Sequence, residues 1–94
     1  MQTIILRLNP EKLSNPDLDI RYVLPDLLAE KSGSLIVDGG YEYENYDLNR
    51  INPLLLHLQT TDVEKALVYI KDVIENTKVL GNDLKDAVDI ILNG

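Results

Sequence analysis

Residues 54–76, LLLHLQTTDVEKALVYIKDVIEN, contain the two patterns that decide the fold. From Leu54 to Thr60 the residues alternate, with leucines 54, 56 and 58 on one face, which predicts a half-buried strand. From Val63 onward, apolar residues recur at three- and four-residue spacing, which predicts an amphipathic helix ending near Asn76. Thr61 and Glu64 match a capping box, so we expect the helix to begin there.

Residues 3–38, which precede this strand and helix in the sequence, show similar alternating and helical patterns. Residues Thr3 to Asn9 alternate and predict a first strand, and helical spacing from Leu18 to Lys31 predicts a first helix. Pro25 interrupts that helix and removes a backbone donor, so a kink or a restart is expected there. Ser34 to Asp38 predicts a short second strand, ended by Gly39-Gly40, beyond which alternation resumes only weakly.

The last segment has two interpretations. Residues Ala87 to Asn93 alternate as a strand, whereas Leu84, Ala87, Val88 and Ile91 also fit a helical spacing. The strand interpretation gives the order β-α-β-β-α-β in a single domain of residues 1–94. This order predicts an α+β, ferredoxin-like sandwich: a four-stranded antiparallel sheet, in spatial order 4-1-3-2, with two helices on one face.

The other face of such a sheet would be open. One apolar side chain from each strand is predicted to lie on it, beside the single histidine: Ile5, Ile36, Leu55 and Ile91, with His57. A patch of this kind can mark a binding or homodimer surface. The alternative is that neighbouring long side chains or the acidic segment cover it.

Composition narrows the classes of function. A net charge of −7 argues against nucleic-acid binding and against binding to anionic membranes, since both require clustered Lys and Arg. The chain has no cysteine, so it has no thiolate nucleophile and no Cys-ligated metal. It shows no signal-like N-terminus and no long apolar run, so we expect a cytoplasmic protein.

The sequence favours no catalytic chemistry. A general acid–base role for His57 would require an orienting carboxylate, for which Asp38 and Asp89 are candidates. A solvated histidine is the simpler interpretation. No phosphate-binding, dinucleotide-binding or nucleophile motif is present, and the carboxylates lack a metal-ligand spacing. We therefore expect no catalytic residue, no metal and no cofactor.

The segment Asp38 to Asp47, DGGYEYENYD, is the best functional candidate. It contains four carboxylates, three of the five tyrosines and no base. Amphipathic rings beside acids are suited to recognising a basic protein surface. The predicted partner-binding residues are Asp38, Tyr41, Glu42, Tyr43, Glu44, Tyr46 and Asp47. The alternative is a solvated connection between strands whose tyrosines pack back on the sheet.

Four segments carry a family resemblance. They are residues 15–22 (NPDLDIRY), 24–27 (LPDL), 38–43 (DGGYEY), and Glu75-Asn76 followed by 81–84 (GNDL). Together they resemble small bacterial ferredoxin-like proteins of unassigned function and, more loosely, ferredoxin-like immunity proteins that neutralise a toxin. The resemblance implies an acidic single-domain protein that covers a basic toxin surface, and it implies no catalytic residues.

Two hypotheses follow. The first is a non-enzymatic module that binds a basic protein through the acidic segment, an immunity or inhibitor protein being one example. The second is a small-molecule-sensing or regulatory domain that forms a homodimer through the open sheet face.

Overall fold

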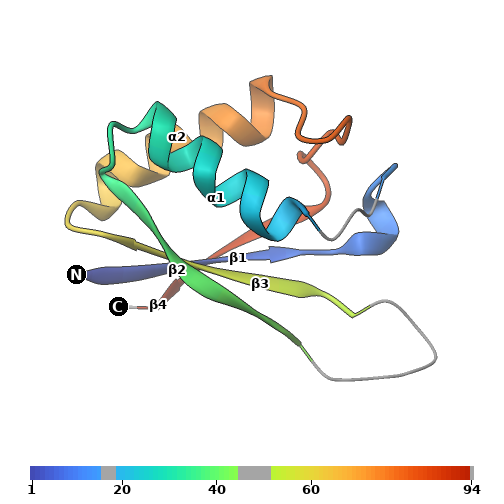
Figure 1. Cartoon of the computed structure of the whole chain (residues 1–94), viewed down its shortest axis with the longest axis horizontal. Helices are drawn as coiled ribbons and strands as arrows, with labels where there is room; N and C mark the ends of the chain where they lie inside the picture. Colours follow the sequence, from blue (N-terminus) through green and yellow to red (C-terminus); the bar gives the residue numbers. More distant parts are fainter. Residues whose placement is uncertain (16–18, 45–51, 94) are drawn as a thin grey trace.

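The computed structural model describes residues 1–15, 19–44 and 52–93 of the 94-residue chain. Its elements follow the order predicted from the sequence (Figure 1). They are strand β1 (Gln2–Leu8), a 3₁₀ turn (Pro10–Lys12), helix α1 (Ile20–Lys31), strand β2 (Ile36–Tyr43), strand β3 (Leu54–Thr60), helix α2 (Val63–Asn76) and strand β4 (Val88–Asn93).

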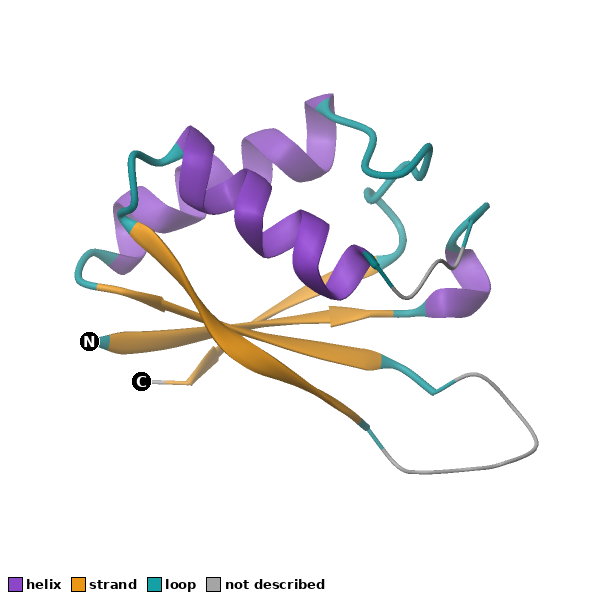
Figure 2. Ribbon diagram, viewed as in Figure 1, coloured by secondary structure: helices purple, strands orange, loops and turns teal. Residues whose placement is uncertain are grey.

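The four strands form one antiparallel sheet in the order β2-β3-β1-β4, with both helices on the same face (Figure 2). The predicted ferredoxin-like α+β fold and its strand order are therefore confirmed. The last segment is a strand, so the helical alternative is wrong. β2 and β4 are the edge strands, and α1 lies nearer β2 than α2 does (Figure 1).

The core lies between the sheet and the helices, because one alternating face of each central strand is apolar. Leu56 and Leu58 of β3 are fully buried, as are Ile4 and Leu6 of β1, whose Cα partners they are. From the helices, Leu24, Leu28, Ala66, Ile70 and Val73 complete this layer. The faces predicted for β1, β3 and β4 are thus the observed ones.

Helix α1 runs continuously through Pro25, so the predicted restart is wrong. Proline removes only the bond to the carbonyl four residues earlier, and here that residue is Arg21, in the first turn. Leu18, the predicted start, lies outside the described residues. Gly33 follows the helix with φ +62°, as expected for a C-terminal cap. Among the described residues, neither helix is long and apolar enough to span a bilayer.

Helix α2 begins one residue later than predicted. Its N-cap is Asp62, whose side chain accepts a hydrogen bond from the Lys65 amide at 3.1 Å. Thr61 is exposed and does not cap the helix, so the predicted capping box is wrong. Aspartate caps as well as threonine does, and Asp62 has the extended backbone that an N-cap needs.

The prediction that the second strand ends at Gly39-Gly40 is wrong, because β2 continues to Tyr43. The pairing shifts between Asp38, opposite Leu58, and Tyr41, opposite Leu56. Two glycines on β2 therefore face one residue on β3, which is a β-bulge. Gly40 has φ +105°, a conformation that side chains strongly disfavour. The glycines bend the strand and do not terminate it.

Candidate functional site

The acidic segment predicted to be a loop is largely part of the sheet. Asp38, Tyr41, Glu42 and Tyr43 belong to β2, and Glu44 follows it directly. Two further candidates, Tyr46 and Asp47, lie outside the described residues. Residues 38–43 therefore form an edge of the sheet where a loop was expected.

After the bulge, the side chains of Tyr41, Glu42 and Tyr43 alternate between the two faces of the sheet. Tyr41 and Tyr43 lie opposite Leu56 and Leu54, which are buried beneath the helices. Glu42 lies opposite Leu55, on the open face. Directly opposite residues share a face of the sheet, so the tyrosines lie on the helix side and Glu42 on the open side. The sheet thus separates Glu42 from the two rings that flank it in sequence, whereas Asp38, opposite Leu58, lies on the helix side.

On the helix side, the tyrosines of β2 meet the first turn of α1. Tyr22 contacts Tyr41 edge to face, with ring centroids 5.9 Å apart, and Tyr41 contacts Tyr43 in the same way at 6.1 Å. The Arg21 guanidinium lies 4.8 Å from the Tyr22 ring centroid and 5.2 Å from that of Tyr41. We call Arg21, Tyr22, Tyr41 and Tyr43 the tyrosine–arginine surface.

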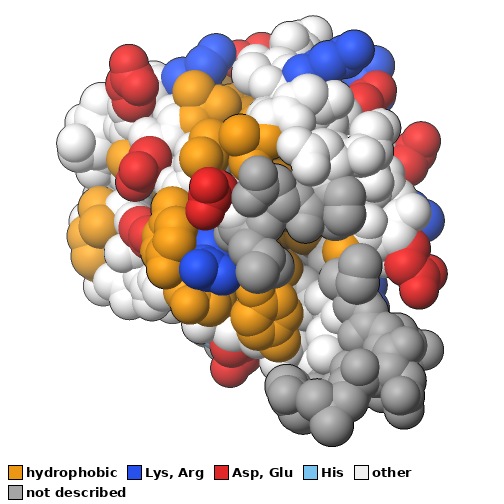
Figure 3. Space-filling model, turned by 45° about the vertical axis from the view of Figure 1, so that its right-hand side comes forward, with side chains coloured by type: hydrophobic (Ala, Val, Ile, Leu, Met, Phe, Trp, Pro, Cys, Tyr) orange, Lys and Arg blue, Asp and Glu red, His pale blue; other side chains and the backbone are white. Residues whose placement is uncertain are grey.

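The rings of this surface hold one another in place but are not buried. Tyr22, Tyr41 and Tyr43 remain 46%, 41% and 39% exposed. In Figure 3, hydrophobic side chains, with tyrosines coloured among them, gather on one face with basic and acidic side chains close by. Edge-to-face and cation–π contacts each add about 0.5–1.5 kcal/mol, so the exposed rings have a defined arrangement.

Arg21 also sets the electrostatics of this surface. A hydrogen-bonding contact with Arg21 lowers the pKa of the Tyr22 phenol, and a hydrogen bond with Tyr22 raises the pKa of Tyr41. Contacts with the Tyr22 and Tyr43 phenols in turn raise the pKa of Arg21. The Arg21 Nε is enclosed and has no hydrogen-bond partner among the described residues. The cation is therefore held against the rings mainly by their faces and hydroxyl groups.

The open face carries charged side chains that pair across the strands. Arg7 Nε lies 2.6 Å from a Glu44 carboxylate oxygen, and Arg7 Nη1 lies 3.7 Å from Asp89. The hydrogen bond to Glu44 raises the pKa of Arg7. His57 Nε2 lies 3.2 Å from Glu42 Oε1. Asp38 and Asp89 were only candidates to orient His57 in an acid–base role, and the structure places Glu42 beside it.

Four of the five residues predicted for the open face lie on it: Ile5, Leu55, His57 and Ile91. Ile5 pairs with both His57 and Ile91, and Leu55 lies diagonally across from Ile5, so these residues share one face. The assignment of Ile36 is wrong, because Ile36 lies opposite the buried Thr60 and is itself fully buried. Its neighbour Val37, 39% exposed, takes that place.

On the open face, as far as the structure describes it, the acidic side chains form no metal-binding group. Among residues 1–15, 19–44 and 52–93, no three His, Asp or Glu side chains are grouped to hold a metal ion. Glu42 and His57 form a pair whose side chains are 60% and 29% exposed. The predictions of no cofactor and no catalytic residue stay predictions.

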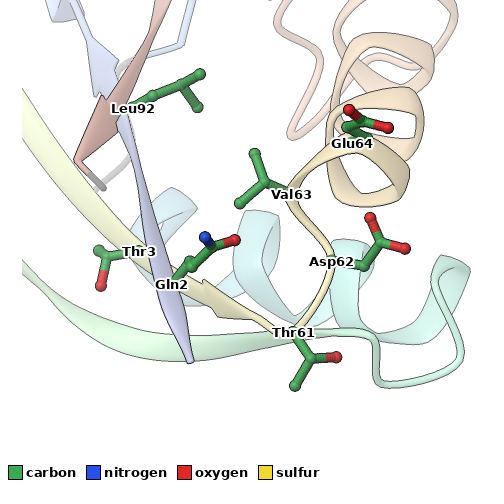
Figure 4. A pocket seen from close by; sticks show the side chains of 7 residues that line it. All are labelled: Gln2, Thr3, Thr61, Asp62, Val63, Glu64 and Leu92. Carbon is green, nitrogen blue, oxygen red and sulfur yellow. The ribbon is translucent and has the colours of Figure 1, made fainter.

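A hollow of about 470 Å³ lies where α2 begins, between the end of β4 and the start of β1. Figure 4 shows the side chains of Val63 and Leu92 on opposite sides of it, with Gln2 below them. Asp62 and Glu64 make it acidic at the end of a helix that would otherwise favour anions. Its acidic lining therefore disfavours an anionic ligand.

Sequence reasoning missed the contribution of α1. Arg21 and Tyr22 fall outside the apolar stripe of their helix, so periodicity assigned them no role. The sequence signal that could have indicated this role is Tyr22, a large aromatic residue outside the apolar stripe near the start of the predicted helix.

No protein-family model matches the chain, and comparisons with curated proteins and with solved structures find no match. The resemblance to ferredoxin-like immunity proteins therefore stays a prediction.

Proposed function

We propose that this protein is a non-enzymatic binding module that recognises a basic partner protein through the β2 edge. The observation that carries the proposal is the tyrosine–arginine surface, in which three rings are ordered by mutual contact yet left about two-fifths exposed. Tyrosine and arginine are the residue types that dominate binding energy in protein interfaces. Rings ordered before binding lose little further entropy when a partner covers them.

The charges of β2 indicate which charge the partner's binding surface should carry. Asp38, Glu42 and Glu44 lie on or directly after the strand, which contains no Lys or Arg. Arg7 pairs with Glu44, whereas the Glu42 side chain is 60% exposed and lies 3.2 Å from His57 Nε2. A partner with Lys or Arg at its surface would complement this edge, and the net charge of −7 would speed its approach.

A toxin inhibited by an immunity protein in the cytoplasm is one such pair. The acidic edge and the ordered rings support this proposal.

The test uses paired charge changes. The protein carrying Asp38→Asn and Glu42→Gln loses two exposed acids of β2 without losing side-chain volume or the acceptor that Asp38 offers the Gly40 amide. The control, Glu30→Gln with Glu75→Gln, makes the same net change on exposed helix positions. A partner captured from the native cell is purified and its affinity for each variant is measured.

We expect the β2 variant to bind at least about tenfold more weakly and the control to bind within about twofold of the unmodified protein. Rising salt should reduce the difference, because exposed charges are screened within about 8 Å at physiological ionic strength. Equal affinities for both variants would remove the acids of β2 from the binding site.

The open face supports a second candidate, a regulatory domain that dimerises there. Ile91, 41% exposed, lies beside the half-buried Ile5, and Val37, 39% exposed, lies opposite Gln59 on the same face. A dimer through this patch would also bury the paired charges of Arg7 and Glu44. The cost of removing these charges from water would reduce the free energy gained by dimerisation. Light scattering at rising concentration decides the matter: a monomer throughout, unchanged by Leu55→Glu, counts against the dimer.

A further inference from the structure

We infer that the partner binds as an added strand: an extended segment with alternating basic and apolar residues pairs with the outer edge of β2. The inference rests on the proposed function and specifies how that site is used. It follows from three features of β2: the direction of its backbone groups, the sorting of its side chains onto two faces, and its charge.

The backbone groups of Tyr41 and Tyr43 point out of the sheet. The Glu44 amide donates a 2.9 Å hydrogen bond to the Pro53 carbonyl, toward β3. In an antiparallel ladder such pairs recur at every second residue, so Glu42 also bonds toward β3. The N–H and C=O groups of Tyr41 and Tyr43 then face away from β3. Because β2 is an edge strand, no described strand pairs with them.

These backbone groups belong to the same residues as the exposed rings. An extended segment that bonds to Tyr41 and Tyr43 would pass beside the tyrosine–arginine surface, so main-chain and side-chain contacts would form together. When a peptide is added to a sheet as a strand, main-chain hydrogen bonds provide affinity and side-chain contacts provide specificity. The bulge at Gly39-Gly40 interrupts the ladder, so the pairing surface begins after it and is short.

The two faces of β2 determine the pattern of the added strand. Side chains of that strand that point to the helix side would meet the exposed rings of Tyr41 and Tyr43. Side chains that point to the open side would meet Glu42. Successive residues of a strand point to opposite faces, so apolar residues should alternate with Lys or Arg.

The same charges argue against a second copy of this chain as the occupant. Two antiparallel copies of β2 that bond through Tyr41 and Tyr43 would be centred on Glu42. Each Glu42 would then lie directly opposite the Glu42 of the other copy. Like charges directly opposite each other on paired strands are destabilising. Complementary charge therefore selects a basic segment of another protein.

The test uses short synthetic peptides of alternating lysine and valine. One peptide is unmodified, and two carry N-methyl groups on alternate amides, either at the lysines or at the valines. A strand presents only one of these two rows of amides to β2, and methylation of that row prevents pairing. Nuclear magnetic resonance of the labelled protein reports affinity, and hydrogen exchange reports the protection of the Tyr41 and Tyr43 amides.

We expect the unmodified peptide to slow exchange at Tyr41 and Tyr43 at least about tenfold, with little effect on the Glu42 amide, which already bonds within the sheet. We also expect the two methylated peptides to differ at least about tenfold in affinity. Salt-sensitive binding with equal affinities and unchanged exchange would overturn strand addition and leave the proposed function standing. No salt-sensitive binding by any peptide, with the captured partner also indifferent to the β2 charge changes, would overturn both. Protection that rises with protein concentration alone would identify a second copy as the occupant and overturn the inference.

Discussion

The substitution Gly40→Ala tests the bulge that places Tyr41 and Tyr43 on the helix side. Gly40 has φ +105°, and a Cβ added there would meet no heavy atom within 4 Å. Its cost is therefore conformational and not steric. An L residue in so disfavoured a region costs about 2–3 kcal/mol. At about 4–8 °C per kcal/mol for a domain of this size, the Tm should fall by about 10 °C or more.

Gly33→Ala is the matched control. A Cβ at Gly33 also meets nothing within 4 Å, but its φ of +62° lies in the left-handed helical region, where an L residue costs about 1 kcal/mol. Urea and thermal unfolding followed by circular dichroism give both free energies. If Gly40→Ala destabilises the protein no more than Gly33→Ala does, the positive φ at the bulge is not required. Loss of the Tyr22–Tyr41 ring contact in a stable Gly40→Ala protein would instead show that the bulge can be removed.

Three further predictions concern the core, the helix cap and the tyrosines. Leu56→Ala, at a fully buried site, should lower the free energy of unfolding by about 2–5 kcal/mol in urea titrations; less than about 1 kcal/mol would contradict the assigned core face. Asp62→Ala should cost about 0.5–2 kcal/mol and Thr61→Ala less than about 0.5, and the reverse order would restore Thr61 as the cap. In a titration followed by tyrosinate absorbance, Tyr22 should ionise before Tyr41, because Arg21 lowers the pKa of Tyr22. Tyr22→Phe should remove the early step. Since the folded pKa of Tyr22 lies below its ordinary value of 10.0, its ionisation adds stability above that pH, and this is lost as pH falls through the folded pKa. An early step that survives Tyr22→Phe would refute the assignment.

The sequence predicts the fold where one period dominates a segment. Leu54–Thr60 alternates without interruption, so its bounds and faces follow directly from the pattern. The same is true of α2 except at its cap, where two adjacent residues could both fill the role. β2 resisted prediction because its apolar pattern is broken by Gly39-Gly40. A bulge adds one residue and so reverses every later side chain, and nothing in the alternation states whether glycines end a strand or bend it.

The candidate site was predictable in its residues but not in its arrangement. Composition alone singled out Tyr41, Glu42 and Tyr43. Only the sheet register shows that the acid and the rings lie on opposite faces. Arg21 and Tyr22 enter the site through packing between α1 and β2, a contact between distant segments that local periodicity does not report.

The most direct test of the account is the affinity of the purified partner for the Tyr41→Ala protein, with Leu92→Ala as control. Leu92 is 58% exposed on β4, the opposite edge of the sheet, and shares no contact with the tyrosine–arginine surface. Both variants are first shown by thermal unfolding to be folded. A residue central to an interface contributes about 2 kcal/mol or more, so Tyr41→Ala should raise the Kd at least about 30-fold. Leu92→Ala should leave the Kd within about twofold. A Kd for folded Tyr41→Ala that equals that of the unmodified protein would contradict the claim that the β2 edge binds the partner.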